Sequence, residues 1–231
     1  MVDLIDGLKK CGIPESAVET LAQKMEAYIK EIILFNSAYN LTNTSDRDEL
    51  VVRHIFDSLA AWKKLESLVV ECLRSECIEN TSTTTVSIAD IGSGGGLPGI
   101  PLAAAFSSAG IDSVRFELVE RMEKRCAFLE NCAAILGLKN VTVVNSEAER
   151  VEAEAYDLIT FRAFRPLDKK MTKTLLRIVK NNGHLCAYKA KEASIKEEMD
   201  GIKALVPEYE VVPLAVPGLE DSERNLVIIK K

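Results

Sequence analysis

The stretch SIADIGSGGGLPGIPLA, residues 87–103, places five glycines and two prolines between an apolar run and an alanine-rich run. The residues that lead into it, TVSIADI, are β-branched and apolar, which is typical of a buried strand. The residues that follow predict a helix ending near Gly110. Glycines let a backbone approach a ligand with no Cβ between them, and free N–H groups at a helix start attract electron-rich groups. The stretch therefore predicts a strand–loop–helix unit that holds a ligand against its loop.

Strand and helix patterns alternate from this unit to the C-terminus. Alternation of this kind predicts a mostly parallel sheet with helices on both faces, and two consecutive final strands predict a hairpin at the sheet edge. The fold class is therefore α/β, with a Rossmann-like, mostly parallel seven-stranded sheet. The expected strands after the first are residues 113–120, 140–146, 156–163, 184–190, 209–216 and 224–231, and the expected helices are residues 124–137, 167–181 and 191–206.

The N-terminal part of the chain has a helical pattern and no strand pattern. From Pro14 to about Phe35 the apolar residues recur at helical spacing, and a second helical stretch runs from about residue 49 to 73. The polar run at residues 75–85 predicts a surface linker. We therefore divide the chain into a helical N-terminal extension, residues 1–82, and an α/β domain, residues 83–231.

Composition excludes several classes of protein. The chain has 231 residues and a net charge of −6, and it has no apolar run long enough to cross a bilayer and no secretory signal, so we expect a cytoplasmic protein with no membrane partner. The six cysteines form no C-x-x-C and there are two histidines, which predicts reduced, buried cysteines and no metal site. An acidic chain is unusual for a nucleic-acid-binding protein unless its cations gather on one face.

Two cofactor fingerprints fit the glycine loop. Gly94-x-Gly96-x-x-Gly99 matches the dinucleotide pattern, whereas Asp90-x-Gly92-x-Gly94-x-Gly96 matches the loop of S-adenosylmethionine (SAM)-dependent methyltransferases. The two prolines beside Gly99 favour the second interpretation. Glu120 ends the next strand, where a carboxylate suits the two ribose hydroxyls of either cofactor. The chain leaves no room for the separate substrate domain of a dehydrogenase, so we expect SAM as the cofactor.

An ordered set of short segments carries a resemblance to one family. These segments are YNLTN, VRHIFDSLA, IADIGSGGGLPGIPLA, LVERMEKRCAFLE, NSEAE, FRAF and ERNLVIIKK. From about Asn40 to the C-terminus the chain resembles the bacterial 16S ribosomal RNA guanine-N7 methyltransferases, historically called glucose-inhibited division protein B. The resemblance implies a class I SAM-dependent enzyme that methylates N7 of a guanine in the 530 loop of 16S rRNA, on naked rRNA or on the small ribosomal subunit. We expect it to act as a monomer.

The resemblance also implies which residues form the site. The expected cofactor contacts, including those predicted from the glycine loop and strand end, are Gly92, Gly94, Leu97, Glu120, Ala148, Glu149 and Arg162. The expected positioning residues near the mouth of the site are Asn40, Arg53, His54, Arg162 and Lys189, with Asp57 in the same N-terminal signature. YKAK stands where the family pattern has lysine followed by glycine. An alternative for Asp57 is a pair with Arg53 across one helical turn.

Guanine N7 has an in-plane lone pair and no proton to lose, which agrees with a chain that shows no obvious catalytic base. A methyltransferase of a small molecule or a protein, and a non-enzymatic RNA-binding protein that keeps SAM, remain as alternatives. The cations that can form one local patch for RNA are Arg53, Lys124, Arg125, Lys169, Lys170, Lys173, Arg177 and Lys189.

Overall fold

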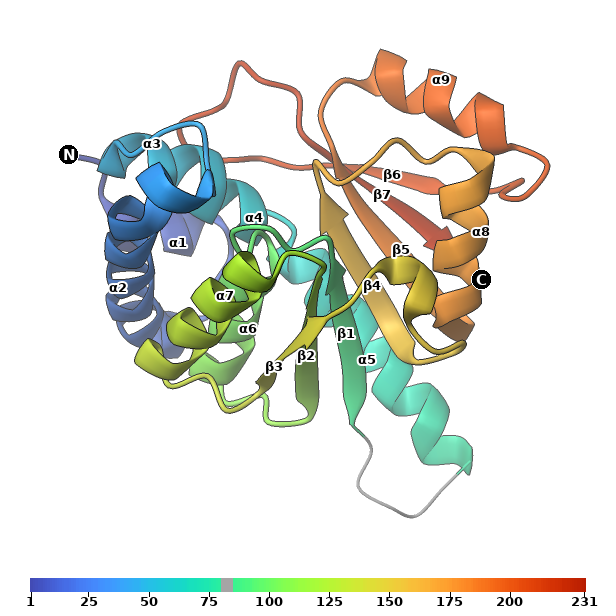
Figure 1. The fold of residues 1–231 in the computed structure, drawn as a ribbon, viewed down its shortest axis with the longest axis horizontal. Helices are drawn as coiled ribbons and strands as arrows, with labels where there is room; N and C mark the ends of the chain where they lie inside the picture. Colours follow the sequence, from blue (N-terminus) through green and yellow to red (C-terminus); the bar gives the residue numbers. More distant parts are fainter. Residues whose placement is uncertain (80–84) are drawn as a thin grey trace.

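The computed structural model describes residues 1–79 and 85–231 (Figure 1). Within these residues seven strands form one sheet in the order β3-β2-β1-β4-β5-β7-β6. All neighbouring strands from β3 to β5 are parallel, and β7 is antiparallel to both β5 and β6. The predicted α/β sheet with an antiparallel pair at its edge is confirmed. The strands are β1 Val86–Ile91, β2 Val114–Glu120, β3 Val141–Asn145, β4 Tyr156–Arg162, β5 Val179–Lys189, β6 Glu210–Pro213 and β7 Asn225–Lys230.

The strand order reverses at β1, and this reversal positions the site. Strand β1 lies between β2 and β4, with Asp90 opposite Leu118 on one side and Thr160 on the other. Chain segments leaving the carboxyl ends of β1 and β4 therefore diverge toward opposite faces of the sheet. A crevice opens at such a point, and parallel α/β sheets bind their ligands there.

Helices cover both faces of the sheet (Figure 1). They are α6 Gly99–Ser108, α7 Glu123–Ile135, the short 3₁₀ turn η2 Ala148–Arg150, α8 Lys169–Ile178 and α9 Glu192–Ile202. The sequence places the end of α8 at residue 181, but Val179 already pairs with Tyr156 of β4. Val179 is β-branched and buried, so pairing within the sheet takes this residue and its neighbours out of the helix.

Within the described residues, all regular secondary structure of the N-terminal extension is helical, and α1, α2 and α3 lie at the left of Figure 1. It contains α1 Leu4–Lys10, α2 Glu15–Tyr39, α3 Arg47–Leu50, the π-helical stretch η1 Val51–Phe56, α4 Asp57–Leu59 and α5 Trp62–Glu79. Helix α5 runs five residues into the stretch predicted as a linker, since that stretch lacks the glycine or proline that would stop a helix. The domain boundary expected between residues 82 and 83 lies outside the described residues.

Two apolar clusters occupy the two faces of the sheet. Ile88 of β1 joins a cluster with α2, α5 and α6, whereas its neighbour Ala89 joins the cluster under α8 and α9. This split follows from the alternation of side chains along a strand. Four cysteines of the described residues are buried and free, as expected; they are Cys11, Cys126, Cys132 and Cys186. Cys72 is buried as well. In the described part of the chain no helix is long and apolar enough to cross a membrane, and no cluster of potential metal ligands is found.

Candidate functional site

The glycine loop, residues 92–98, leaves β1 at the crevice and is held there by Asp90. Gly92, Gly94 and Gly96 have φ values of 69°, 59° and 91°, a left-handed conformation that glycine adopts without strain. The carboxylate of Asp90 is buried and accepts hydrogen bonds from the Ser93 hydroxyl (2.7 Å) and from the backbone N–H of Gly99 (3.1 Å). Burial raises the pKa of Asp90 to about 6. A single buried carboxylate thus joins the two ends of the loop.

Close packing explains some of the loop glycines, and Gly94 differs from them. A Cβ on Gly92 would lie 2.1 Å from the ring of Phe164, and a Cβ on Gly99 would lie 2.7 Å from the carboxylate of Asp90. A Cβ on Gly94 would meet nothing closer than 3.8 Å. The backbone at Gly94 therefore faces open space, where a ligand can reach it.

Glu120 is fixed at the tip of β2 and is shielded from solvent. Its side chain is buried, and its two oxygens accept hydrogen bonds from the backbone N–H groups of Gly94 and Met122, both at 2.9 Å. A carboxylate oxygen has two lone-pair sites, so each oxygen retains one acceptor position. Glu120 can therefore order the glycine loop and still accept hydrogen bonds from a ligand.

A cavity of about 200 Å³ lies between these carboxyl ends of the strands. Its wall includes Gly92, Glu120, Ala148 and Glu149, which are four of the predicted cofactor residues. Arg125 of α7 also lines it. The buried Nε of Arg125 has no hydrogen-bond partner within the described chain, while its Nη2 donates to the backbone carbonyl of Asn40 (3.1 Å).

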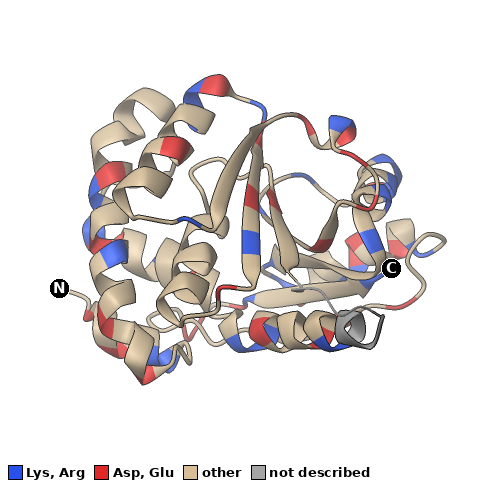
Figure 2. Ribbon diagram, turned by 90° about the horizontal axis from the view of Figure 1, so that it is seen from below, with Lys and Arg blue, Asp and Glu red and all other residues tan. Residues whose placement is uncertain are grey.

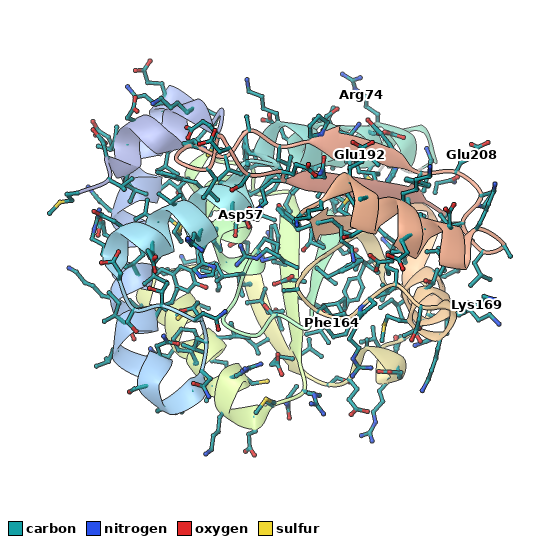
Figure 3. The ribbon with its side chains drawn as sticks, turned by 90° about the horizontal axis from the view of Figure 1, so that it is seen from above. Asp57, Arg74, Phe164, Lys169, Glu192 and Glu208 are labelled. Atoms are coloured by element: carbon teal, nitrogen blue, oxygen red, sulfur yellow. The ribbon has the colours of Figure 1, made fainter. Side chains whose placement is uncertain are left out.

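A second cavity, of about 540 Å³, lies on the other side of the β4–α8 loop. Ala163, Phe164 and Arg165 line both cavities, so this loop forms the wall between them. In Figure 3 the labelled Phe164 and Asp57 lie toward the middle of the molecule. The wall of the larger cavity also includes Arg162, Tyr188, Lys189, Glu198 and Arg224.

Asp57 joins three distant parts of the chain at the edge of the larger cavity. Its Oδ2 lies 2.6 Å from Nη1 of Arg162 at the end of β4, and its Oδ1 lies 3.0 Å from Nε of Arg224 before β7. The side chains of Asp57 and Arg162 are about 10% and 14% exposed. The alternative pair of Asp57 with Arg53 is wrong, because the arginines that reach Asp57 are Arg162, at the end of β4, and Arg224, just before β7.

His54 contacts the same arginine. Its Nδ1 lies 3.1 Å from Nη2 of Arg162, and because a guanidinium only donates, Nδ1 accepts and the ring is neutral. Burial, together with the positive charge of Arg162, lowers the pKa of His54 to about 4. His54 therefore holds Arg162 in place at neutral pH and is not a proton carrier there.

Lys189 ends β5 and lines the larger cavity. Its Nζ lies 2.8 Å from Oε1 of Glu198 on α9 and 6.0 Å from the centre of the Phe161 ring. The same Glu198 oxygen accepts a short hydrogen bond from the backbone N–H of Leu167 in the β4–α8 loop. Lys189 is thus directed by an ion pair and belongs to the cavity wall, not to an outer surface patch.

Several of the predicted residues do not line either cavity. Among the described residues that form the two walls, Asn40, Arg53, Gly94 and Leu97 do not appear. Leu97 is buried in the apolar cluster, and Arg53 is exposed, with its carbonyl accepting from Arg162 (3.3 Å). Asn40 ends α2 in a left-handed conformation.

Sequence reasoning assigned no role to several residues that the structure brings to this region. Arg224 lies within a segment that carried the family resemblance, which was its only signal. Tyr28 had none: it lies in the apolar stripe of α2, and its hydroxyl donates a short hydrogen bond to the carbonyl of Gly95 in the glycine loop. Tyr188 and Glu198 are visible as site residues only once the strands are placed side by side.

Comparison with solved structures shows the fold. A putative SAM-dependent methyltransferase from Methanococcus maripaludis superposes with a TM-score of 0.54 at 14% identity, over 88% of this chain and 91% of that one. A putative sarcosine dimethylglycine methyltransferase from Galdieria sulphuraria superposes with a TM-score of 0.51 at 13% identity, over 89% and 98%. The fold is that of class I SAM-dependent methyltransferases, as expected from the sequence.

Comparison of sequences shows the family. The protein from Treponema denticola named ribosomal RNA small subunit methyltransferase G is 40% identical over 99% of this chain and 93% of its own length. The protein of the same name from Treponema pallidum is 37% identical over 90% and 85%. The family model described as rRNA small subunit methyltransferase G matches residues 21–227. The chain belongs to the rRNA small subunit methyltransferase G family.

Proposed function

We propose that this chain transfers the methyl group of SAM to N7 of a guanine in 16S rRNA, with the cofactor across the smaller cavity and the base in the larger one. The observation that carries the proposal is the pair of cavities that meet at Ala163–Arg165, beside the glycine loop. A methyl donor and its acceptor need such an arrangement, because the reacting atoms must lie within about 3.5 Å of each other.

The smaller cavity fits the adenosine part of SAM. Glu120 retains one acceptor position on each oxygen for the two ribose hydroxyls, and its buried position fixes their direction. Ala148 and Glu149 line the part of the wall formed by η2, where the base of the nucleoside would lie. Gly92 and Gly94 leave the loop backbone open to the methionine part, and the unpartnered Nε of Arg125 supplies a buried donor for an electron-rich atom of the cofactor.

The larger cavity fits an acceptor atom that brings its own lone pair. Among the described residues that line it, the carboxylates are those of Asp57 and Glu198, and both are paired with cations. Neither is free to remove a proton. Bound SAM supplies an electrophilic methyl group on a sulfonium sulfur. Transfer of this group to guanine N7 would form the N–C bond and leave the electrons of the broken S–C bond on sulfur, so no residue of this chain would need to accept a proton.

The residues of this chain then act by position. Arg162, held by Asp57 and His54, presents a fixed positive charge at the wall of the larger cavity. The ring of Phe164 lies over Gly92, between the two cavities, where it can pack against an inserted base. We propose that the chain acts as a monomer in the cytoplasm, since one chain forms both cavities and assembling ribosomes are the source of its substrate.

The test uses small-subunit rRNA in which the target guanine is replaced by 7-deazaguanine. This base keeps the Watson–Crick edge and lacks the N7 lone pair. With tritium-labelled SAM we expect label in unmodified rRNA, unchanged RNA binding to the 7-deaza substrate, and no transfer to it. Transfer to the 7-deaza substrate at the normal rate would contradict the N7 assignment. Label recovered in protein or in small molecules, and not in rRNA, would favour the alternative class of methyltransferase.

A further inference from the structure

Helix α8 presents a cationic face to solvent. Lys169, Lys170, Lys173 and Arg177 are exposed, while Met171, Leu175 and Ile178 on the opposite side are buried. At about 100° per residue the four cations fall within an arc of roughly 100°. Lys169, Lys173 and Arg177 follow one another at four-residue intervals, which is a rise of about 6 Å per step. The four side chains therefore form one stripe along the helix, which we call the α8 cationic face.

The α8 cationic face has no acidic residue on its own helix to neutralise it. The helix sequence KKMTKTLLRI contains Lys and Arg but no Asp or Glu, whereas the N-terminal helices mix both signs (Figure 2). Within the ion pairs of the described residues, Lys169, Lys170 and Lys173 do not appear. Arg177 donates to the backbone carbonyl of Glu149, and no ion pair of the described residues includes it. A chain of net charge −6 thus keeps a concentrated positive stripe.

This stripe begins at the mouth of the larger cavity. Residues 163–166 line that cavity and continue directly into Asp168, whose side chain caps α8 by accepting from the backbone N–H of Met171. Lys169 is the first residue of the helix, and Figure 3 shows it at the outer edge of the molecule while Phe164 lies inward. A polymer with one unit in the cavity would reach the α8 cationic face within a few residues of chain.

Other cations expected to form an RNA patch are turned inward or paired with an acid. The guanidinium of Arg125 turns inward to the smaller cavity and the carbonyl of Asn40, and Lys189 is paired with Glu198. Helix α9, which follows β5, has a single lysine, Lys196, and its exposed acids are Glu192, Glu197 and Asp200. Among the cations expected to form the patch, a series along one helix therefore occurs on α8, whereas Arg53 and Lys124 are single exposed residues.

We propose that the α8 cationic face binds the phosphates of the RNA segment next to the methylated guanine. This inference rests on the proposed function and adds where the substrate backbone runs. Phosphates on a strand are repeated negative charges, which a row of Lys and Arg complements, and each neutralised phosphate releases counterions. The contacts position the RNA and carry no base specificity.

The test compares a double variant of the α8 cationic face with a matched control. Lys170→Ala/Lys173→Ala removes two charges from the face, and Lys196→Ala/Lys203→Ala removes two charges from exposed positions at α9. Alanine preserves helix propensity in both. The Michaelis constant for the rRNA substrate is measured for wild type and variants at saturating SAM and at several KCl concentrations.

We expect the α8 double variant to raise the Michaelis constant for RNA at low salt, with kcat and the affinity for SAM unchanged. Because each single-stranded phosphate contact contributes about 0.7 to the salt slope, the slope should fall by about 1.4. Raising KCl from 50 to 200 mM should therefore increase the Michaelis constant for RNA by a factor about sevenfold larger in the wild type than in the variant. Lys170→Arg/Lys173→Arg should restore the wild-type slope, which a structural defect would not allow.

A slope and a Michaelis constant in the α8 double variant equal to those of the α9 control would overturn this inference. A loss of activity on assembled subunits with unchanged binding to naked rRNA would also overturn it, since that result would mean that the α8 cationic face contacts a ribosomal protein. If wild-type enzyme transfers no methyl group to RNA, the proposed function fails, and the inference fails with it.

Discussion

Replacing Asp57 by Asn removes the charge that joins Arg162 to Arg224 and keeps the shape of the side chain. The asparagine oxygen can accept from one guanidinium, but its NH₂ group then faces the other, so one arginine loses its partner. Leaving one member of a buried pair uncompensated costs about 3–5 kcal/mol, and a hydrogen bond to a charged group contributes about 1.5–3 kcal/mol. Because the side chain of Arg224 is 30% exposed and water can solvate it, we expect about 2–3 kcal/mol.

The assay measures thermal unfolding by calorimetry, with Glu210→Gln as the control. Glu210 pairs with Lys64 at 2.9 Å, but its side chain is 55% exposed, and such surface pairs contribute at most about 1 kcal/mol. At about 2–4 °C per kcal/mol for a chain of this size, Asp57→Asn should lower Tm by roughly 5–10 °C. Methyl transfer should fall as well, since Arg162 loses its support. A Tm change no larger than that of Glu210→Gln would refute the reasoning.

Three further predictions concern the cofactor loop and pH. Gly94→Val should abolish SAM binding in calorimetry, because a β-branched residue is strained at a φ of 59° and its side chain enters the open space over the loop. The control Gly110→Val, at a φ of 71° and far from the site, should bind SAM normally. Normal binding by both variants would refute the loop assignment. Glu120→Gln should weaken SAM binding about tenfold, since its NH₂ group faces the donor N–H of Gly94 or Met122; unchanged affinity would contradict the ribose role. The pKa of His54 falls to about 4 on folding, so the unfolded chain binds more protons below pH 6.5 and stability falls as the pH drops from 6.5 toward 4. His54→Gln should flatten this dependence in urea denaturation, and an unchanged slope would disprove it.

Local patterns were sufficient to predict the sheet and the position of the cofactor loop. Each β–α unit carries its own apolar run and turn residues, and parallel strands bring their carboxyl ends to one edge, so Glu120 and Arg162 could be placed at that edge in advance. The end of α8 could not, because Val179 is a strand residue only in the presence of Tyr156 from β4.

The ion-pair network could not be predicted for a related reason. Asp57 and Arg224 are 167 positions apart, and their contact depends on how η1 and α4 lie against β7 and its preceding loop. Spacing along the chain favoured Arg53 as the partner of Asp57, whereas in the folded chain Asp57 pairs with Arg162 and Arg224. The same holds for Glu198, which serves Lys189 and the backbone of Leu167 from a helix whose sequence gives no functional signal.

The hydrogen bond from Tyr28 to the carbonyl of Gly95 has a consequence for how the molecule opens. Leu21, Met25 and Tyr28 of α2 belong to the same apolar cluster as Ile100 and Phe106 of α6, so α2 and the glycine loop are packed as one body. Opening of α2 exposes this cluster and releases the loop at the same time. A ligand that stabilises the loop therefore slows amide hydrogen exchange along α2, so exchange at α2 reports cofactor binding at the glycine loop.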